Sequence, residues 1–231
     1  MILTMKSDIF VARSIALANA IAIDMATATG GAEWSAQAAL LTPISKAFGT
    51  DAGCRIAEMG VQVHGGMGFV EETGAAQYYR DVRVTAIYEG TNGIQAMDLV
   101  GRKLMDGGEA ACHLLDDIQA TLETARSKMP DLVEPIWQST ESLREAIDWM
   151  VAQKDVNDRF AGSVSFLKAF ARVLGGFYHL RAALAEDGIG PRTKLAKFYV
   201  TSILPEYKGL LEQSCQGASD LYSMTVDELS A

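Results

Sequence analysis

One carboxylate stands out because of the residues around it. Glu89 lies between an aromatic residue and a glycine in the run Ile87-Tyr88-Glu89-Gly90-Thr91. Thr91 or Asn92 can cap a following helix, because either side-chain oxygen accepts a first-turn N–H. Glu89 then lies on irregular backbone before a helix, where a rigid scaffold often presents a catalytic carboxylate. Its apolar neighbours could exclude water and favour a general base, but a solvated turn residue explains the pattern as well.

A glycine-rich stretch lies a short way upstream, in Gln62-Val63-His64-Gly65-Gly66-Met67-Gly68-Phe69. Closely spaced glycines let the backbone approach a ligand and expose N–H groups to it. The stretch is neither a G-x-G-x-x-G fingerprint nor a P-loop, since no Gly-Lys-Ser/Thr follows. A helix-ending turn explains Gly65 and Gly66 equally well.

The elements that position these two stretches are predicted to be helices throughout. Apolar residues recur at helical spacing, and no β-rich region or internal repeat is found. Gly30 and Gly31 end a first, apolar helix that we expect to be buried among others. Pro43 either kinks the second helix or starts a fresh one capped by Thr42. The predicted helices cover residues 2–28, 35–64, 75–81, 92–104, 109–128, two amphipathic stretches between 132 and 178, 193–203 and 207–221, with extended chain over 82–87.

This pattern predicts an all-α fold in two parts. Residues 1–108 form a four-helix-bundle-like domain, and residues 109–231 form an additional helical region packed on it. The Gly107-Gly108 pair is the best boundary. One continuous body is the alternative, because no flexible linker separates the parts.

Composition excludes several classes of function. The chain has 231 residues and a net charge of −9, which argues against a nucleic-acid partner. We expect no membrane span, because no uncharged apolar stretch of about 18 residues is found. The three cysteines lack a C-x-x-C pair and are typical of free thiols in a reducing compartment. The three histidines lack metal-ligand spacing.

Residues 62–104 resemble the C-terminal domain of the acyl-CoA dehydrogenases. The similarity is carried by the glycine-rich stretch, by Tyr79-Arg80-Asp81, and by Tyr88-Glu89-Gly90-Thr91 with Gln95, in the family's order and spacing. Residues 41–47 and 98–104 resemble the larger subfamily, whose members carry an extra helical C-terminal region. Many shorter members have a basic residue where this chain has Ala96. That departure favours the larger subfamily.

The resemblance implies an FAD-dependent α,β-dehydrogenation of an acyl-CoA thioester to the trans-2-enoyl-CoA. Glu89 matches the base that removes the α-proton, and Tyr88 and Gly90 match the substrate-binding positions. FAD contacts are implied for Gln62, Val63, His64, Gly65, Gly66, Thr91, Asn92 and Gly93, the glycine-rich contact being made across a subunit interface. Electron-transfer flavoprotein is the implied partner, a homo-oligomer the implied assembly, fatty-acid β-oxidation the implied process, and the cytoplasm the implied location.

The resemblance also leaves alternatives open. An oxidase relative would pass its electrons to oxygen, and a non-catalytic helical assembly module would carry no activity. In the family an N-terminal helical domain, a middle β-domain and one long helix precede the point where this chain begins, so we expect these residues alone to bind FAD weakly and not to turn over substrate. We expect His64 to be packed as readily as touching cofactor, and Arg80 to pair with Asp81. Acyl chain length is not predicted.

Overall fold

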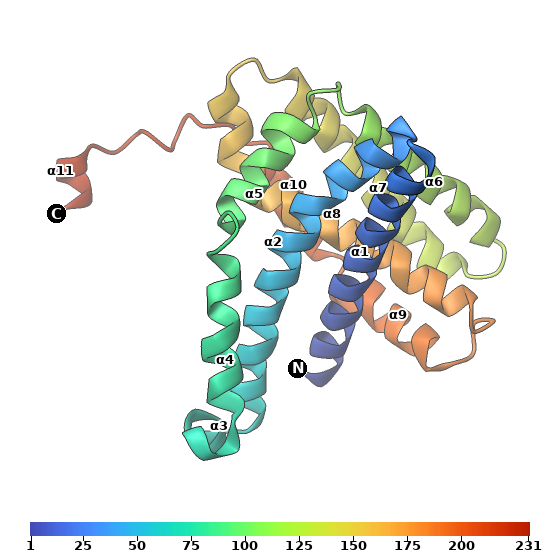
Figure 1. The fold of residues 1–231 in the computed structure, drawn as a ribbon, viewed down its shortest axis with the longest axis horizontal. Helices are drawn as coiled ribbons and strands as arrows, with labels where there is room; N and C mark the ends of the chain where they lie inside the picture. Colours follow the sequence, from blue (N-terminus) through green and yellow to red (C-terminus); the bar gives the residue numbers. More distant parts are fainter.

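The computed structural model describes residues 1–231, and it consists of helices with no strand, which confirms the all-α prediction. Two long antiparallel helices, α1 and α2, stand beside a body formed by the other helices, and the C-terminal segment extends away from it (Figure 1). The α-helices are α1 (Ile2–Thr29), α2 (Ala32–Val63), α3 (Gly66–Phe69), α4 (Ala75–Arg83), α5 (Asn92–Asp98), α6 (Glu109–Ala125), α7 (Pro130–Ala152), α8 (Val156–Leu184), α9 (Pro191–Ser202), α10 (Glu206–Ser214) and α11 (Val226–Leu229). Short 3₁₀ segments η1 (Glu71–Thr73) and η2 (Val84–Ala86) and a π-helical segment η3 (Leu99–Lys103) complete the chain.

The environment of α1 differs from the prediction. The helix ends at Gly30, as expected, where a left-handed φ of 67° stops it. However, Leu3, Leu17 and Ile21 are each more than half exposed. The expectation that α1 is buried among other helices is therefore wrong for this chain, because α2, α8 and α9 cover only part of its surface.

By length and composition, α1 is also the one helix in this chain that could cross a membrane, and 17% of its apolar window is buried. Asp8 of α1 is 2% exposed and forms an ion pair with Arg172 of α8. This buried pair ties α1 to the helical body. The absence of a membrane span stays a prediction.

The helix α2 runs unbroken through Pro43. No fresh helix starts there, and the Thr42 hydroxyl donates back to the Ala38 carbonyl at 2.8 Å instead of capping one. The residues of α2 that contact the Glu89 turn therefore lie on one continuous helix.

The segment before Glu89 is a second correction. Alternation over residues 82–87 predicts extended chain, but α4 continues to Arg83 and η2 follows it. Val82 packs on α2, where a Cβ added at Gly53 would lie 2.9 Å from its Cγ2 atom. Packing of a helical turn against α2 therefore outweighs a β-like pattern that is too short to form a sheet.

One hydrophobic core of 42 buried residues runs through the molecule and draws on both predicted parts of the chain. The central helix is α8, with 16 buried residues. Glycines let its neighbours approach closely, since a Cβ at Gly162 would collide with the Ser214 carbonyl and one at Gly175 with the Tyr199 hydroxyl. The core therefore does not divide at Gly107-Gly108.

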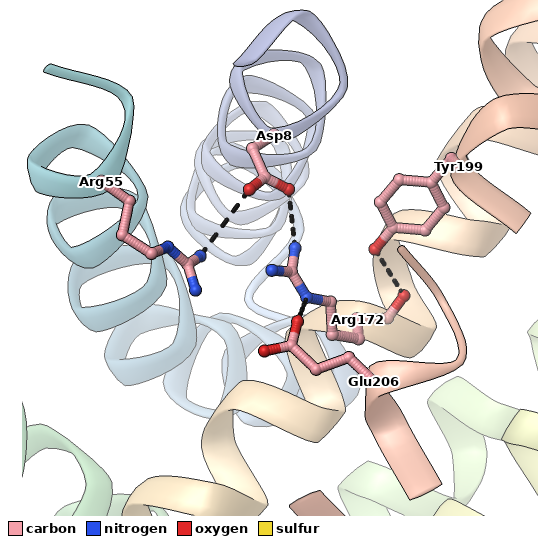
Figure 2. Close-up of polar contacts among 5 residues, drawn as sticks. All are labelled: Asp8, Arg55, Arg172, Tyr199 and Glu206. Atoms are coloured by element: carbon pink, nitrogen blue, oxygen red, sulfur yellow. Dashed lines mark hydrogen bonds and ion pairs between the residues drawn. The ribbon is translucent and has the colours of Figure 1, made fainter. Parts of the chain in front are cut away.

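A polar network centred on the buried pair of Asp8 and Arg172 crosses the same junction (Figure 2). Arg172 of α8 donates to Asp8 of α1 and to Glu206 of α10, each at 2.6 Å. Arg55 of α2 lies 3.7 Å from the other Asp8 oxygen. The Tyr199 hydroxyl donates to the Arg172 carbonyl at 2.9 Å. Four helices from both parts of the chain thus share one set of paired charges, and α9 adds a hydrogen bond to it.

Candidate functional site

Glu89 lies on the turn that joins η2 to α5, as the sequence predicts. Its φ of 55° is left-handed, which is uncommon for a residue with a Cβ, and Gly90 follows with a φ of 84°. Two successive residues in this region reverse the chain sharply. A side chain at position 90 would also meet the Gln95 amide nitrogen at 3.0 Å, so the turn requires its glycine.

The carboxylate of Glu89 is exposed in this chain. Ile87 and Tyr88 are 54% and 50% exposed, so they do not enclose it. The expectation that these two neighbours exclude water from Glu89 is not met by residues 1–231 alone. Any low-polarity environment would have to come from groups outside this chain.

The start of α5 has one of the two predicted caps. Thr91 is the cap, and its hydroxyl accepts the Ile94 N–H at 3.4 Å. The Asn92 side chain turns inward, where its amide donates to Asp51 of α2 at 2.7 Å and to the Thr50 hydroxyl at 2.9 Å. Only the backbone of Asn92 is then free to face a cofactor.

Two further residues fix the turn and were not singled out as functional from sequence. Lys46 of α2 donates to the Gly90 carbonyl at 2.7 Å and to the Asn92 side-chain oxygen at 2.8 Å. Gln95 donates to the Glu89 carbonyl at 3.1 Å. Lys46 is 44 residues from Gly90 in sequence, and no local pattern connects them.

The glycine-rich stretch ends α2 and opens α3. Gly65 has φ 60° and ψ −142°, a conformation that essentially only glycine adopts. A Cβ at Gly65, Gly66 or Gly93 would meet no atom within 4 Å, so the backbone faces open space at all three. Gly68 has a packing role instead, because a Cβ there would collide with the Val61 carbonyl.

The other members of the stretch lie at the surface. Gln62, Val63 and His64 are exposed. A His64 ring nitrogen lies 2.8 Å from the Gly60 carbonyl, and the ring lines an apolar cavity of about 420 Å³ between α1, α2 and α4. His64 is therefore hydrogen-bonded locally without being enclosed.

The two stretches lie at opposite ends of α4 (Figure 1). The nine residues of α4 rise about 14 Å at 1.5 Å per residue. Within one chain, the glycine-rich end and the Glu89 turn do not come together in one compact site.

The residues between them form one ion pair, which differs from the predicted one. Arg80 donates to Glu71 of η1 at 2.8 Å and does not pair with Asp81. Adjacent residues on a helix point in different directions, so Asp81 cannot face Arg80. The guanidinium lowers the pKa of the Glu71 carboxyl. This exposed pair links η1 to α4 at the surface.

No group of three or more His, Cys, Asp or Glu side chains is placed to hold a metal ion. Cys54, Cys112 and Cys215 are free thiols. The structure thus defines an all-helical domain with two exposed features. The carboxylate of Glu89 lies on a turn that is held by hydrogen bonds, and at the other end of α4 the backbone of the glycine-rich stretch faces open space.

Comparison with known proteins assigns this domain to a family. Residues 1–105 match the sequence model described as "Acyl-CoA dehydrogenase, C-terminal domain", and residues 114–225 match the one described as "Acetyl-CoA dehydrogenase C-terminal like". The chain belongs to the acyl-CoA dehydrogenase family, and it corresponds to the C-terminal part of its members.

Curated relatives agree with this assignment. The chain is 39% identical over 197 residues to 3-methylmercaptopropionyl-CoA dehydrogenase of Ruegeria pomeroyi, which covers 81% of this chain and 33% of the relative. It is 31% identical over 192 residues to butyryl-CoA dehydrogenase of Syntrophomonas wolfei, covering 74% and 31%. The chain therefore spans about a third of the length of these relatives.

Solved structures share the fold. The crystal structure of Caenorhabditis elegans ACDH-11 in complex with C11-CoA superposes with a TM-score of 0.73 at 18% identity, over 84% of this chain and 34% of that one. An acyl-CoA dehydrogenase from Bacillus anthracis complexed with FAD gives 0.71 at 17% identity, over 99% and 44%.

Proposed function

We propose that this chain carries the catalytic base of an FAD-dependent acyl-CoA dehydrogenase, with Glu89 removing the α-proton of an acyl-CoA thioester. The observation that carries the proposal is the Glu89 turn itself, where a carboxylate is held in a left-handed conformation at the start of α5. The names of the relatives, all CoA-ester dehydrogenases, support the substrate class.

The chemistry gives each residue of the turn a task. The α-proton of a thioester is only weakly acidic, so the base must be well placed, and the negative charge that develops on the thioester oxygen must be stabilised. Glu89 takes the proton on its carboxylate, and its backbone N–H is the proposed donor to the thioester oxygen. Gly90 leaves room for the substrate beside the base, and Tyr88 lies on the same exposed turn.

The chain also fits a flavin. FAD, when bound, would accept the hydride that leaves the β-carbon. It would be held at one end of α4 by Gln62, Val63, His64, Gly65 and Gly66, and at the other end by Thr91, Asn92 and Gly93. The backbone is open at both ends, because a Cβ at Gly65, Gly66 or Gly93 would meet nothing within 4 Å. Because the two sets lie at opposite ends of α4, we propose that they serve an assembly of at least two copies.

The wider setting follows from the same proposal. Electron-transfer flavoprotein is the proposed electron acceptor. Three free thiols fit a reducing compartment such as the cytoplasm. Because Glu89 is exposed in residues 1–231, we expect this chain alone to bind FAD weakly and to leave acyl-CoA unreacted.

Two experiments test the proposal. The first is an absorbance spectrum of the purified chain with FAD, before and after anaerobic addition of butyryl-CoA, in which we expect no bleaching. The second joins this chain to the preceding part of the Ruegeria pomeroyi relative, in place of its matching segment. This chimera should reduce a dye with acyl-CoA as electron donor.

The Glu89→Gln variant of the chimera should lose about 10²–10⁴-fold in kcat, the usual contribution of a general base, while keeping its flavin. Retained activity in Glu89→Gln would contradict the role of Glu89. A flavin-loaded wild-type chimera that acyl-CoA does not bleach would contradict the proposed reaction.

A further inference from the structure

Side-chain hydrogen bonds hold the backbone next to Glu89 on both sides of Gly90. The carbonyl of Glu89 accepts from the Gln95 side chain, and the carbonyl of Gly90 accepts from Lys46. Each bond fixes the plane of one peptide, because the peptide group is rigid. Together they fix the two planes that flank Gly90, and with them the direction in which the chain leaves Glu89.

The bond from Lys46 is the long-range one. Lys46 is half-buried on α2 and reaches both the Gly90 carbonyl and the Asn92 side chain. It takes part in none of the ion pairs of this chain. Two of its three ammonium donors are thus used on the turn and none on a carboxylate.

Asn92 completes the connection to α2. Its side-chain oxygen accepts from Lys46, and its amide donates to the Ala47 carbonyl at 3.3 Å as well as to Thr50 and Asp51. Every polar atom of this side chain is therefore engaged by α2. The turn and the first residue of α5 move only if these bonds to α2 break.

We infer that Lys46 is a positioning residue for the reaction of Glu89. The inference rests on the proposed function. Glu89 has a Cβ and yet occupies left-handed backbone, which is costly for such a residue, and Lys46 supplies a charged donor that holds the turn. A displacement of about 1 Å in a catalytic group can reduce the rate about 10²-fold, so loss of the ammonium should act through the placement of Glu89.

The first test measures the order of the turn in the 231-residue chain, without cofactor or substrate. Lys46→Met removes the donors and keeps the aliphatic stem, and Lys46→Gln is a second neutral variant should Lys46→Met not fold. Lys46→Arg keeps charge and donors. Lys168→Met changes a half-buried lysine of α8 and is the matched control.

The readout is the NMR order parameter of the Gly90 and Thr91 amides. A rigid backbone gives about 0.85 and a flexible one below about 0.6. We expect wild type and Lys168→Met near the first value, Lys46→Met near the second, and Lys46→Arg restored toward wild type. Unchanged order in Lys46→Met overturns the inference, whatever the outcome for Glu89.

The second test asks whether order matters for chemistry, in the chimera described above. Lys46→Met should lower kcat about 10²-fold with little change in KM, and Lys46→Arg should recover part of it. On a Glu89→Gln background, Lys46→Met should cause no further loss, whereas a general loss of stability would multiply with it. An unchanged kcat, or fully multiplicative losses, overturns the inference. Full activity in Glu89→Gln instead refutes the proposed function.

Discussion

His179 of α8 gives the sharpest prediction about stability. Its side chain is 1% exposed, its ring lies 4.6 Å from that of Phe10 and 4.5 Å from that of Tyr199, and its Nε2 atom has no hydrogen-bond partner. Burial, with a smaller contribution from the charge of Arg192, lowers the pKa of His179 from 6.5 to about 4, and a bond to the Ser7 backbone opposes this only in part. The folded protein therefore keeps this imidazole neutral.

The sign of the pH effect follows directly. Because the folded state binds the proton more weakly than the unfolded state, the stability due to the neutral imidazole is complete above pH 6.5 and is lost as the pH falls toward 4. A shift from 6.5 to about 4 corresponds to about 3 kcal/mol at 1.36 kcal/mol per pKa unit. About 2 kcal/mol of this should already be lost between pH 7.5 and pH 5.

The assay is urea unfolding at pH 7.5 and pH 5, with wild type compared with His179→Leu. The variant removes the titrating group and keeps an apolar side chain, so its free energy of unfolding should fall by about 2 kcal/mol less over this interval. His113→Gln, which changes an exposed histidine of α6, should follow wild type. Parallel pH dependence in wild type and His179→Leu would refute the reasoning.

Two further substitutions test the packing around α8. Arg172→Met leaves the buried carboxylate of Asp8 with only the Arg55 guanidinium, at 3.7 Å. It should lower the free energy of unfolding in urea by about 3 kcal/mol, the lower end for a broken buried pair, and Asp8→Leu in the same chain should restore much of this. A double variant that is less stable than Arg172→Met would contradict this. Gly162→Ala places a methyl against the Ser214 carbonyl and should destabilise the protein by about 1–3 kcal/mol. The control Gly209→Ala on α10 meets nothing within 4 Å and should stabilise the protein by up to about 1 kcal/mol. Equal midpoints of the two variants in thermal unfolding would contradict the close approach of Gly162 to Ser214.

The parts of the fold that sequence predicts are those with local causes. The end of α1 at Gly30 is set by one residue that readily takes left-handed backbone. The cap at Thr91 is set by a hydroxyl that meets an N–H three residues later. The position of Glu89 on a turn follows from the cap at Thr91, and the helical period places most of the remaining helices within a few residues. The last predicted helix, 207–221, is too long, because α10 ends at Ser214.

The parts that sequence misses depend on contacts between distant residues. Arg80 could pair with an adjacent or a more distant carboxylate, and only the fold brings it to Glu71. Residues 82–87 alternate like a strand, but their packing on α2 makes them helical. Likewise, nothing near Lys46 indicates that its ammonium meets Gly90. The candidate base was thus predictable, and the residues that hold it were not.

The additional helical region bears on the site through α8. The helix α5, which follows the Glu89 turn, packs on both α2 and α8. Directly after it, η3 approaches α8 so closely that a Cβ at Gly101 would lie 2.9 Å from the ring of Phe160. The turn is therefore held to α2 by Lys46, while the helix behind it rests on the region after residue 108. The domain boundary at Gly107-Gly108 stays a prediction. In the structure, the region after residue 108 packs against the helix that follows Glu89 and so helps to support the turn.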